Sequence, residues 1–150
     1  MGYVVRPAES KDIEEILPQL KKFSEFYGTS HELYGKDLAH SYNVLDTLIN
    51  QHFFSVVEID QKIIGFIAGT LAPHFFNNEI TVLSEVFWWV NEEHRSNRAG
   101  ALLFQEFMDF GKANADWITM TIEHHSPVKE ESLLKRGFSL QEKSYLMEVR

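Results

Sequence analysis

The chain of 150 residues contains no cysteine and no long apolar run, and these two absences exclude several kinds of protein. Without cysteine there is neither a disulfide framework nor a thiolate metal site. A membrane-spanning helix needs about 20 consecutive apolar residues, whereas the longest apolar stretch, Val86 to Val90, has the length of a strand. Residues 1–6 also lack the pattern of a signal peptide. We therefore expect a cytoplasmic protein that does not contact a membrane.

Positive charge is scarce as well, because 22 acidic and 14 basic residues give a formal net charge of −8. Such a surface repels nucleic-acid phosphates unless its basic residues cluster. The densest cluster is His94, Arg95 and Arg98, in one short segment that suits a small anionic ligand better than a duplex. We expect no nucleic-acid partner. We also expect no metal site, since the pair His124 and His125 has no further ligand at metal-binding spacing.

What the sequence does contain is enough apolar material, 44% of residues, for one core. No linker, repeat or biased segment divides it, so residues 1–150 are expected to form a single domain. The patterns predict strands at 3–7, 53–59, 63–71, 81–90 and 117–122, with one or two more within 138–149. They predict helices from an N-cap at Ser10 to a stop at Gly28, at 37–51, after Gly100, and from Ser126-Pro127 to a stop at Gly137. An antiparallel meander followed by a βαβ unit indicates an α/β domain with a mixed sheet.

The strongest local signal is the segment from Val90 to Leu103, in which a strand, a short basic turn and a helix follow one another. The first amides of a helix have no intrahelical partners, and the helix dipole places partial positive charge there. A pyrophosphate fits such a position, with Arg95 and Arg98 adding charge and Gly100 allowing close approach of the backbone. The alternative is an ordinary solvated loop with a glycine turn.

This segment resembles the Arg/Gln-x-x-Gly-x-Gly/Ala motif of the GNAT superfamily of acetyl-CoA-dependent N-acetyltransferases. Arg95, Ala99, Gly100 and the preceding Val90 fit the motif, while Arg98 stands where its first glycine is usual. A second resemblance lies at 133–138, which is similar to the family's Tyr-x-x-x-Gly-Phe ending, and the order of elements also matches.

The resemblance implies a GNAT-like fold, with a central, mostly antiparallel sheet that splays open beside strand 81–90 and about four flanking helices. It implies acetyl-CoA as cosubstrate, with backbone groups near Trp89 and Val90 bonding the pantetheine arm and amides of 95–101 holding the pyrophosphate. The implied cofactor-binding residues are Trp89, Val90, Arg95, Ser96, Asn97, Arg98, Ala99, Gly100 and Ala101.

The implied reaction is direct attack of a primary amine, of a small molecule or a protein, on the thioester. An alkylammonium has a pKa near 10.4, so a group must accept its proton. Glu85 is the candidate for catalytic base, because desolvation inside an apolar strand raises the pKa of a carboxyl group. It also resembles the strand glutamate that serves as base in several relatives. The alternative is a glutamate on a solvated strand face, paired with a lysine.

The general acid is not identified, because Leu133 occupies the position of the usual tyrosine, and neither Ser132 nor Tyr145 matches it. A CoA thiolate is a fair leaving group, so the chemistry remains feasible. The second hypothesis is a non-catalytic acyl-CoA-binding module that has lost this acid. A third, acetylation of aminoacyl-tRNA, is disfavoured by the acidic charge balance. The sequence also leaves open whether the protein forms a homodimer.

The amine acceptor itself is not identified by the sequence. The resemblance places the acceptor pocket at the first two helices and nearby loops, to which Glu25, Tyr27, His31, Glu32 and Tyr34 are placed to contribute. The aromatic residues Phe75, Phe76, Phe87, Trp88 and Trp89 are a further candidate lining, although core packing is the favoured interpretation for alternate members of the strand. Because side chains alternate along a strand, only one of Trp88 and Trp89 is expected to border the site.

Overall fold

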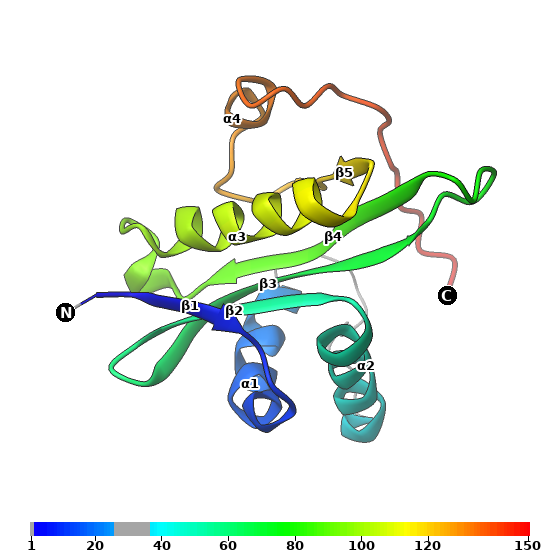
Figure 1. Cartoon of the computed structure of the whole chain (residues 1–150). Helices are drawn as coiled ribbons and strands as arrows, with labels where there is room; N and C mark the ends of the chain where they lie inside the picture. The colour runs from blue at the N-terminus through cyan, green and yellow to red at the C-terminus, as the bar shows by residue number, and fades with distance from the viewer. Residues whose placement is uncertain (1, 26–36) are drawn as a thin grey trace.

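The protein folds around a single twisted sheet with helices on both faces (Figure 1). The computed structural model describes residues 2–25 and 37–150. The strands are β1 (Val4–Pro7), β2 (Phe53–Ile59), β3 (Lys62–Pro73), β4 (Thr81–Val90) and β5 (Trp117–Thr119), in the spatial order β1-β2-β3-β4-β5. The helices are α1 (Ile13–Ser24), α2 (Leu38–Gln51), α3 (Ala99–Asn114) and α4 (Glu130–Leu134). The first four strands are antiparallel and β5 is parallel to β4, which confirms the expected mixed-sheet α/β class.

Two clusters of buried side chains hold the helices against the sheet. On one face α1 and α2 contribute Ile13, Ile16, Leu45 and Leu48, which pack on strand residues including Phe54, Phe66 and Phe87. On the other face α3 contributes Leu103 and Phe107 against Val57, Ile67 and Leu83. The period-of-two alternation of the strands and the helical spacing of the apolar residues thus divide the core between the two faces.

The sheet is complete from β1 to β4 but incomplete between β4 and β5. The parallel pairing covers only three residue pairs, Val82 with Trp117, Leu83 with Ile118, and Ser84 with Thr119. Beyond Ser84, β4 continues to Val90 while the chain after Thr119 forms no further strand with it. The result is the splayed sheet that the resemblance implied, with the opening along residues 85–90.

Most of the expected elements are confirmed, with several strand ends shifted by one or two residues. Asp37 caps α2, since its Oδ1 accepts the backbone N–H of His40 at 3.1 Å. Gly137 follows α4 with φ of +98°, a conformation that favours glycine. The N–H of Phe138 donates to the carbonyl of Leu133 and that of Gly137 to Leu134, the hydrogen-bond pattern of a Schellman helix stop.

Three expectations about helix and strand ends are wrong. Ser10 does not cap α1, because its hydroxyl donates to Asp46; the Asp12 carboxylate instead accepts the N–H of Glu9 at the 3-10 turn that precedes the helix. β5 ends at Thr119 rather than at residue 122, because its pairing with β4 stops at Ser84, just before the register of β4 shifts. The short helix begins at Glu130 rather than at residue 126.

The physical reason for the later start of α4 is a local turn. The hydroxyl oxygen of Ser126 accepts the N–H of Val128 at 3.1 Å, which closes a two-residue turn before any helical bond forms. Residues 138–149, expected to hold one or two strands, form none. Because β5 is only three residues long, its edge offers few backbone partners, and side chains such as Tyr145 and Met147 are exposed. The expected helix stop at Gly28 lies outside the described residues.

No helix in residues 2–25 and 37–150 is long and apolar enough to cross a membrane.

Candidate active site

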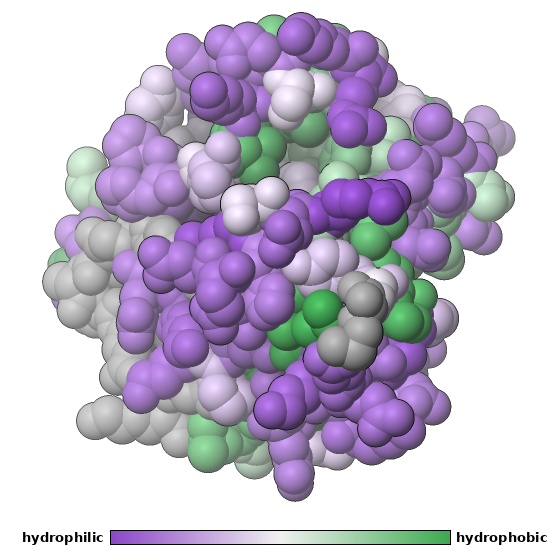
Figure 2. Space-filling view, turned by 90° about the vertical axis from the view of Figure 1, so that its left-hand side faces the viewer, coloured by the Kyte–Doolittle hydropathy of each residue, from purple (hydrophilic) through white to green (hydrophobic). Residues whose placement is uncertain are grey.

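A cavity of about 580 Å³ lies in the opening between β4 and the segment that follows β5. Its lining is predominantly apolar, and a hollow with a hydrophobic floor and a hydrophilic rim is visible between the levels of α4 and α3 in Figure 2. The lining residues come from β4, from the turn and helix after it, from the segment 120–136 and, for one residue, from α1. They are Phe23, Glu85, Val86, Trp88, Trp89, Val90, Arg95, Asn97, Gly100, Ala101, Phe104, Met120, Thr121, Ile122, Glu123, Ser126, Pro127, Val128, Lys129, Ser132, Leu133 and Arg136.

The position of Glu85 in this cavity depends on a β-bulge in β4. Ala68 of β3 pairs with Phe87, but the next residue, Gly69, pairs with Glu85, so Val86 is an extra residue on β4. A bulge re-aims the side chains on either side of it. Leu83, before the bulge, packs on the α3 side, whereas Phe87, after it, packs on the side of α1 and α2. Glu85 lies at the turning point, beside the place where β4 loses its β5 partner.

The carboxylate of Glu85 is held against the segment that follows β5. Its Oε1 accepts the backbone N–H of Thr121 at 3.2 Å. Burial in the cavity wall raises the pKa of Glu85 to about 7, and the Thr121 hydrogen bond opposes this only in part. A carboxyl group with that pKa exchanges a proton near neutral pH, which is the property a general base needs.

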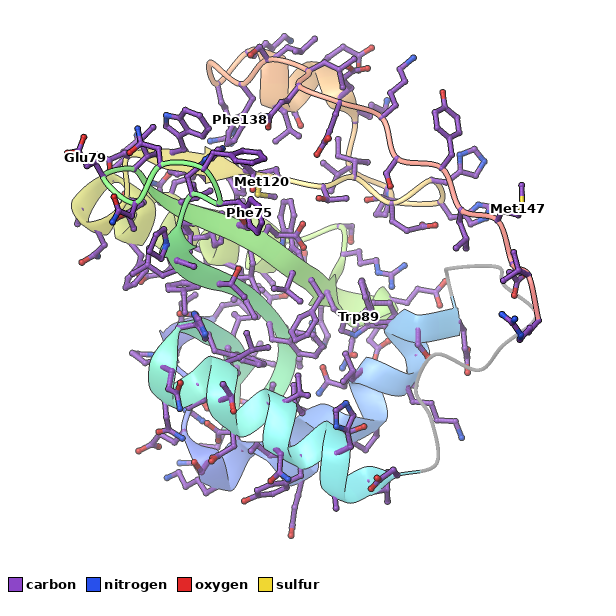
Figure 3. The ribbon with its side chains drawn as sticks, turned by 90° about the vertical axis from the view of Figure 1, so that its right-hand side faces the viewer. Phe75, Glu79, Trp89, Met120, Phe138 and Met147 are labelled. Carbon is purple, nitrogen blue, oxygen red and sulfur yellow. The ribbon has the colours of Figure 1, made fainter. Side chains whose placement is uncertain are left out.

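The two tryptophans at the end of β4 both border the cavity, so the expectation that only one of them does is wrong. Trp88 packs on the α3 side, stacked on Phe104 with ring centroids 5.3 Å apart. Trp89 packs on the opposite side, with its ring edge-on to Phe23 of α1; Figure 3 shows it beside α1. Because the cavity lies in the gap of the sheet itself, side chains from both faces reach it.

The basic turn after β4 is folded back on the strand. The Nε of Arg95 donates to the carbonyl oxygen of Val90 at 2.8 Å, and the guanidinium lies over the Trp89 ring at 4.5 Å. Trp89 in turn donates from Nε1 to Oδ1 of Asn91 at 3.0 Å. His94 is joined to β1 by a hydrogen bond of 3.2 Å between its Nδ1 and the hydroxyl of Tyr3. The turn therefore has a defined conformation, and Arg95 binds the end of β4 in addition to contributing positive charge.

The backbone amides of this turn divide into two groups. Those of Arg95 and Asn97 already donate to the carbonyls of Glu92 and His94. Those at the start of α3, in residues 98–101, have no intrahelical acceptor, as at any helix N-terminus. Gly100 and Ala101 line the cavity, whereas Ser96, Arg98 and Ala99 do not, and Ala99 is fully buried. Anion binding at this turn would thus depend mainly on residues 98–101.

The wall opposite β4 contains residues that the sequence did not single out as ligand-binding. Leu133 and Ser132 of α4 both line the cavity, and Leu133 is buried. Arg136 places its guanidinium 4.8 Å from the centroid of the Phe104 ring, so it continues the stack formed by Phe104 and Trp88. Lys129, at the start of α4, lines the cavity too. For Arg136 and Lys129 the only indication in the sequence was their positive charge, since the sequence does not show that the chain near α4 meets α3.

The remaining candidates lie elsewhere. Phe75 and Phe76 are 90% and 87% exposed at the tip of the β3–β4 turn, where Figure 3 shows Phe75 and Glu79. Neither they nor Glu25 or Tyr145 line the cavity. The other residues expected at the acceptor pocket, Tyr27, His31, Glu32 and Tyr34, lie outside the described residues. In the part of the chain that the structure describes, no group of three or more His, Asp or Glu side chains is arranged to hold a metal ion.

Comparison with known proteins places this geometry in a family context. A family profile described as "Acetyltransferase (GNAT) family" matches residues 18–138. No curated protein is detectably similar to the chain in sequence. Among solved structures, the chain is similar to a ribosomal-protein-alanine N-acetyltransferase from Brucella melitensis biovar Abortus 2308, with a TM-score of 0.77 at 12% identity, covering 100% of this chain and 99% of that one.

Two further similar structures are a glucosamine-6-phosphate N-acetyltransferase from Arabidopsis thaliana and an acetyltransferase from Trypanosoma brucei. The first has a TM-score of 0.73 at 14% identity and covers 100% of both chains. The second has a TM-score of 0.72 at 16% identity and covers 99% of this chain and 100% of that one. At these identities the likeness shows the fold alone.

Proposed function

Since the chain belongs to the acetyltransferase (GNAT) family, we propose that it is an N-acetyltransferase which transfers the acetyl group of acetyl-CoA to a primary amine. The observation that carries the proposal is the position of Glu85, a carboxylate with a pKa of about 7 in a cavity that runs along the open edge of β4 to the start of α3. Two of the similar structures belong to N-acetyltransferases, which supports the choice of an amine acceptor.

The cavity fits acetyl-CoA in shape and charge. Residues 85–90 of β4 span roughly 17 Å at about 3.3 Å per residue, and within residues 2–25 and 37–150 no strand pairs with their outer edge. Backbone groups near Trp89 and Val90 would bond the pantetheine arm, as they would bond a neighbouring strand. The orphan amides of residues 98–101 would hold the pyrophosphate, with charge from Arg95 and Arg98. Ser96 and Asn97 complete the proposed turn, and Arg136 and Lys129 add positive charge on the opposite wall.

Glu85 supplies the proton acceptor in this proposal. The alkylammonium group passes a proton to the Glu85 carboxylate, directly or through water, and the neutral nitrogen that results attacks the thioester carbonyl. The new bond to carbon makes the nitrogen acidic, and its second proton is lost to solvent. The C–S bond then breaks and the thiolate leaves. A pKa of about 7 means that Glu85 is partly ionised at neutral pH and still basic enough to accept the proton. No acid is required of Leu133, whose buried side chain has no proton to give.

The apolar side chain of Leu133 also favours the second candidate function, a module that binds acyl-CoA without turning it over. Both candidates use the same cavity and the same turn at residues 95–101, and they differ only in chemistry.

Two measurements on the full chain separate these functions. Calorimetry should show acetyl-CoA binding that weakens in the double variant R95E/R98E; unchanged affinity there contradicts the proposed turn. Release of free CoA thiol should then be followed with a broad panel of amines and peptides. Release that depends on an amine supports the transferase, whereas binding without release with every acceptor supports the module.

A further inference from the structure

A second carboxylate, Glu123, lies in the same cavity as Glu85. The two are connected by a short path, because the Glu85 carboxylate accepts the N–H of Thr121, and Glu123 follows Thr121 by two residues. Two extended residues span at most about 7 Å. The backbone of Glu123 therefore lies close to the backbone N–H that binds Glu85, and both glutamates line the same cavity.

Glu123 is held in a defined position rather than left to rotate in solvent. Its Oε2 accepts the backbone N–H of His125 at 2.6 Å, and the side chain is half-buried. Within residues 2–25 and 37–150, the ion pairs involve Arg6 and Lys11 with Glu9, Asp12 and Glu58, and include neither Glu85 nor Glu123. Two fixed carboxylates that border one cavity, with no ion pair to a cation of the described residues, can each bind a cationic group of a ligand.

The positive residues of the cavity belong to different parts of its wall. Arg95 lies after the end of β4, and Arg136 lies over Phe104 on α3. Lys129 precedes α4. Glu85, by contrast, lies at the opposite end of the open edge of β4, five residues before Val90. The net charge of −8 adds a general attraction for cations. An acyl-CoA, which is anionic, and a cationic acceptor would thus meet complementary charge in different parts of one cavity.

We propose that the acceptor is a small molecule with two positive charges, of the short alkyl diamine class, whose reacting amine lies at Glu85 and whose second ammonium group lies at Glu123. This inference rests on the proposed function and adds a specificity-determining residue, Glu123, to it. Glu85 accepts the proton of the reacting nitrogen, while Glu123 recognises the charge that does not react.

The test compares putrescine with n-butylamine, which has the same carbon chain but only one amino group. In the parent protein the KM for putrescine should be about tenfold below that for butylamine, well beyond the factor of two expected from its two equivalent amines. In Glu123→Gln this ratio should collapse towards two, mainly through a rise in the KM for putrescine. Glutamine keeps the oxygen that accepts the His125 N–H, so the local turn is retained.

The matched control is Glu130→Gln, which removes the same charge from an exposed position in the first turn of α4 that does not line the cavity. The control should keep the parent's preference for putrescine. Any one of four results overturns the inference. These are equal KM values for the two amines in the parent, an unchanged KM ratio in Glu123→Gln, an equal fall of the ratio in the control, and turnover of neither amine. Acetyl-CoA calorimetry and thiol release with the wider acceptor panel decide the proposed function separately.

Discussion

Replacing Glu85 by glutamine tests whether this side chain accepts the proton of the amine. Glutamine has nearly the same shape and keeps an oxygen that can accept the N–H of Thr121, which lies 3.2 Å from the carboxylate. It cannot accept a proton. At pH 7 we expect turnover to fall on the order of 10²-fold, the usual contribution of a positioned general base. The affinity for acetyl-CoA should stay close to that of the parent, since the cofactor turn is unchanged.

The loss of activity in Glu85→Gln should depend on pH. Because burial raises the pKa of Glu85 to about 7, about half of the protein has the ionised base at pH 7 and only about a tenth at pH 6. In the parent, kcat/KM for the amine should therefore rise up to pH 7 and then stay level towards the pKa of the amine, near 10.4. In Glu85→Gln it should rise steadily across that whole range, because the variant must take up amine that is already neutral. The deficit of the variant thus shrinks at high pH.

The assay is release of CoA thiol from pH 5.5 to 10, with circular dichroism at each end to verify the fold. A variant with full activity at pH 7, or with the same pH profile as the parent, would refute the assignment of Glu85 as base. Stability provides an independent check. A carboxyl group whose pKa is raised from 4.5 to about 7 by folding favours the folded state below pH 4.5, and this contribution is lost as pH rises through 7. Glu85→Gln should therefore raise Tm at pH 8 and change it little at pH 4.

Two further substitutions test the cofactor turn and the sheet edge. A Cβ on Gly100 meets only ordinary contacts, the nearest 3.7 Å away, so Gly100→Ala should raise stability by about 0.5–1 kcal/mol while lowering acetyl-CoA affinity in calorimetry. Gly111→Ala is its control, because that Cβ would lie 2.5 Å from Ile118 and should destabilise the protein without acting at the cavity; higher affinity in Gly100→Ala would contradict the proposed turn. Asp12→Ala should lower the free energy of unfolding in urea by about 2–3 kcal/mol at pH 7, because it breaks a two-bond pair with Arg6 at 2.8 and 2.9 Å. Burial opposes ionisation of Asp12, but its hydrogen bonds from Arg6 and from the Glu9 N–H hold its pKa below the ordinary value, so the loss should shrink as pH falls below about 4; a loss independent of pH would contradict the pairing.

The sequence was sufficient for features that depend on local pattern. The bounds of β2 and β4 follow from runs of apolar, aromatic and β-branched residues, and the helix stop at Gly137 from the need for a left-handed residue. These properties need only the neighbours of a residue along the chain. The raised pKa of Glu85 was also predicted, but the sequence left a solvated strand face as the alternative, and only burial in the cavity wall decides between the two.

Other features depend on how distant segments meet, and these could not be read from the sequence. The bulge at Val86 is defined only against β3. Both tryptophans border the cavity although they point to opposite faces, because β5 pairs with only part of β4 and leaves a gap in the sheet. Arg95 has the charge of a phosphate ligand, but its hydrogen bond to the Val90 carbonyl appears only when the turn is folded. Arg136 and Lys129 reach the cavity because α4 lies across it from β4, which no local pattern indicates.

The short pairing between β4 and β5 also has a consequence for how the molecule opens. The four-stranded meander is joined by long ladders, whereas the described chain after α3 pairs with the sheet as a strand only at 82–84 and otherwise contacts it through a few hydrogen bonds and side chains. Regions with few backbone bonds to their neighbours undergo sub-global unfolding at a lower free energy than the rest of the protein. The amides of β5 and α4 should therefore exchange with solvent hydrogen faster than those of β3. A ligand that contacts both β4 and α4 would connect them as further strand pairs would, and it should slow that exchange. Ligand binding in the cavity would then stabilise the part of the chain after α3.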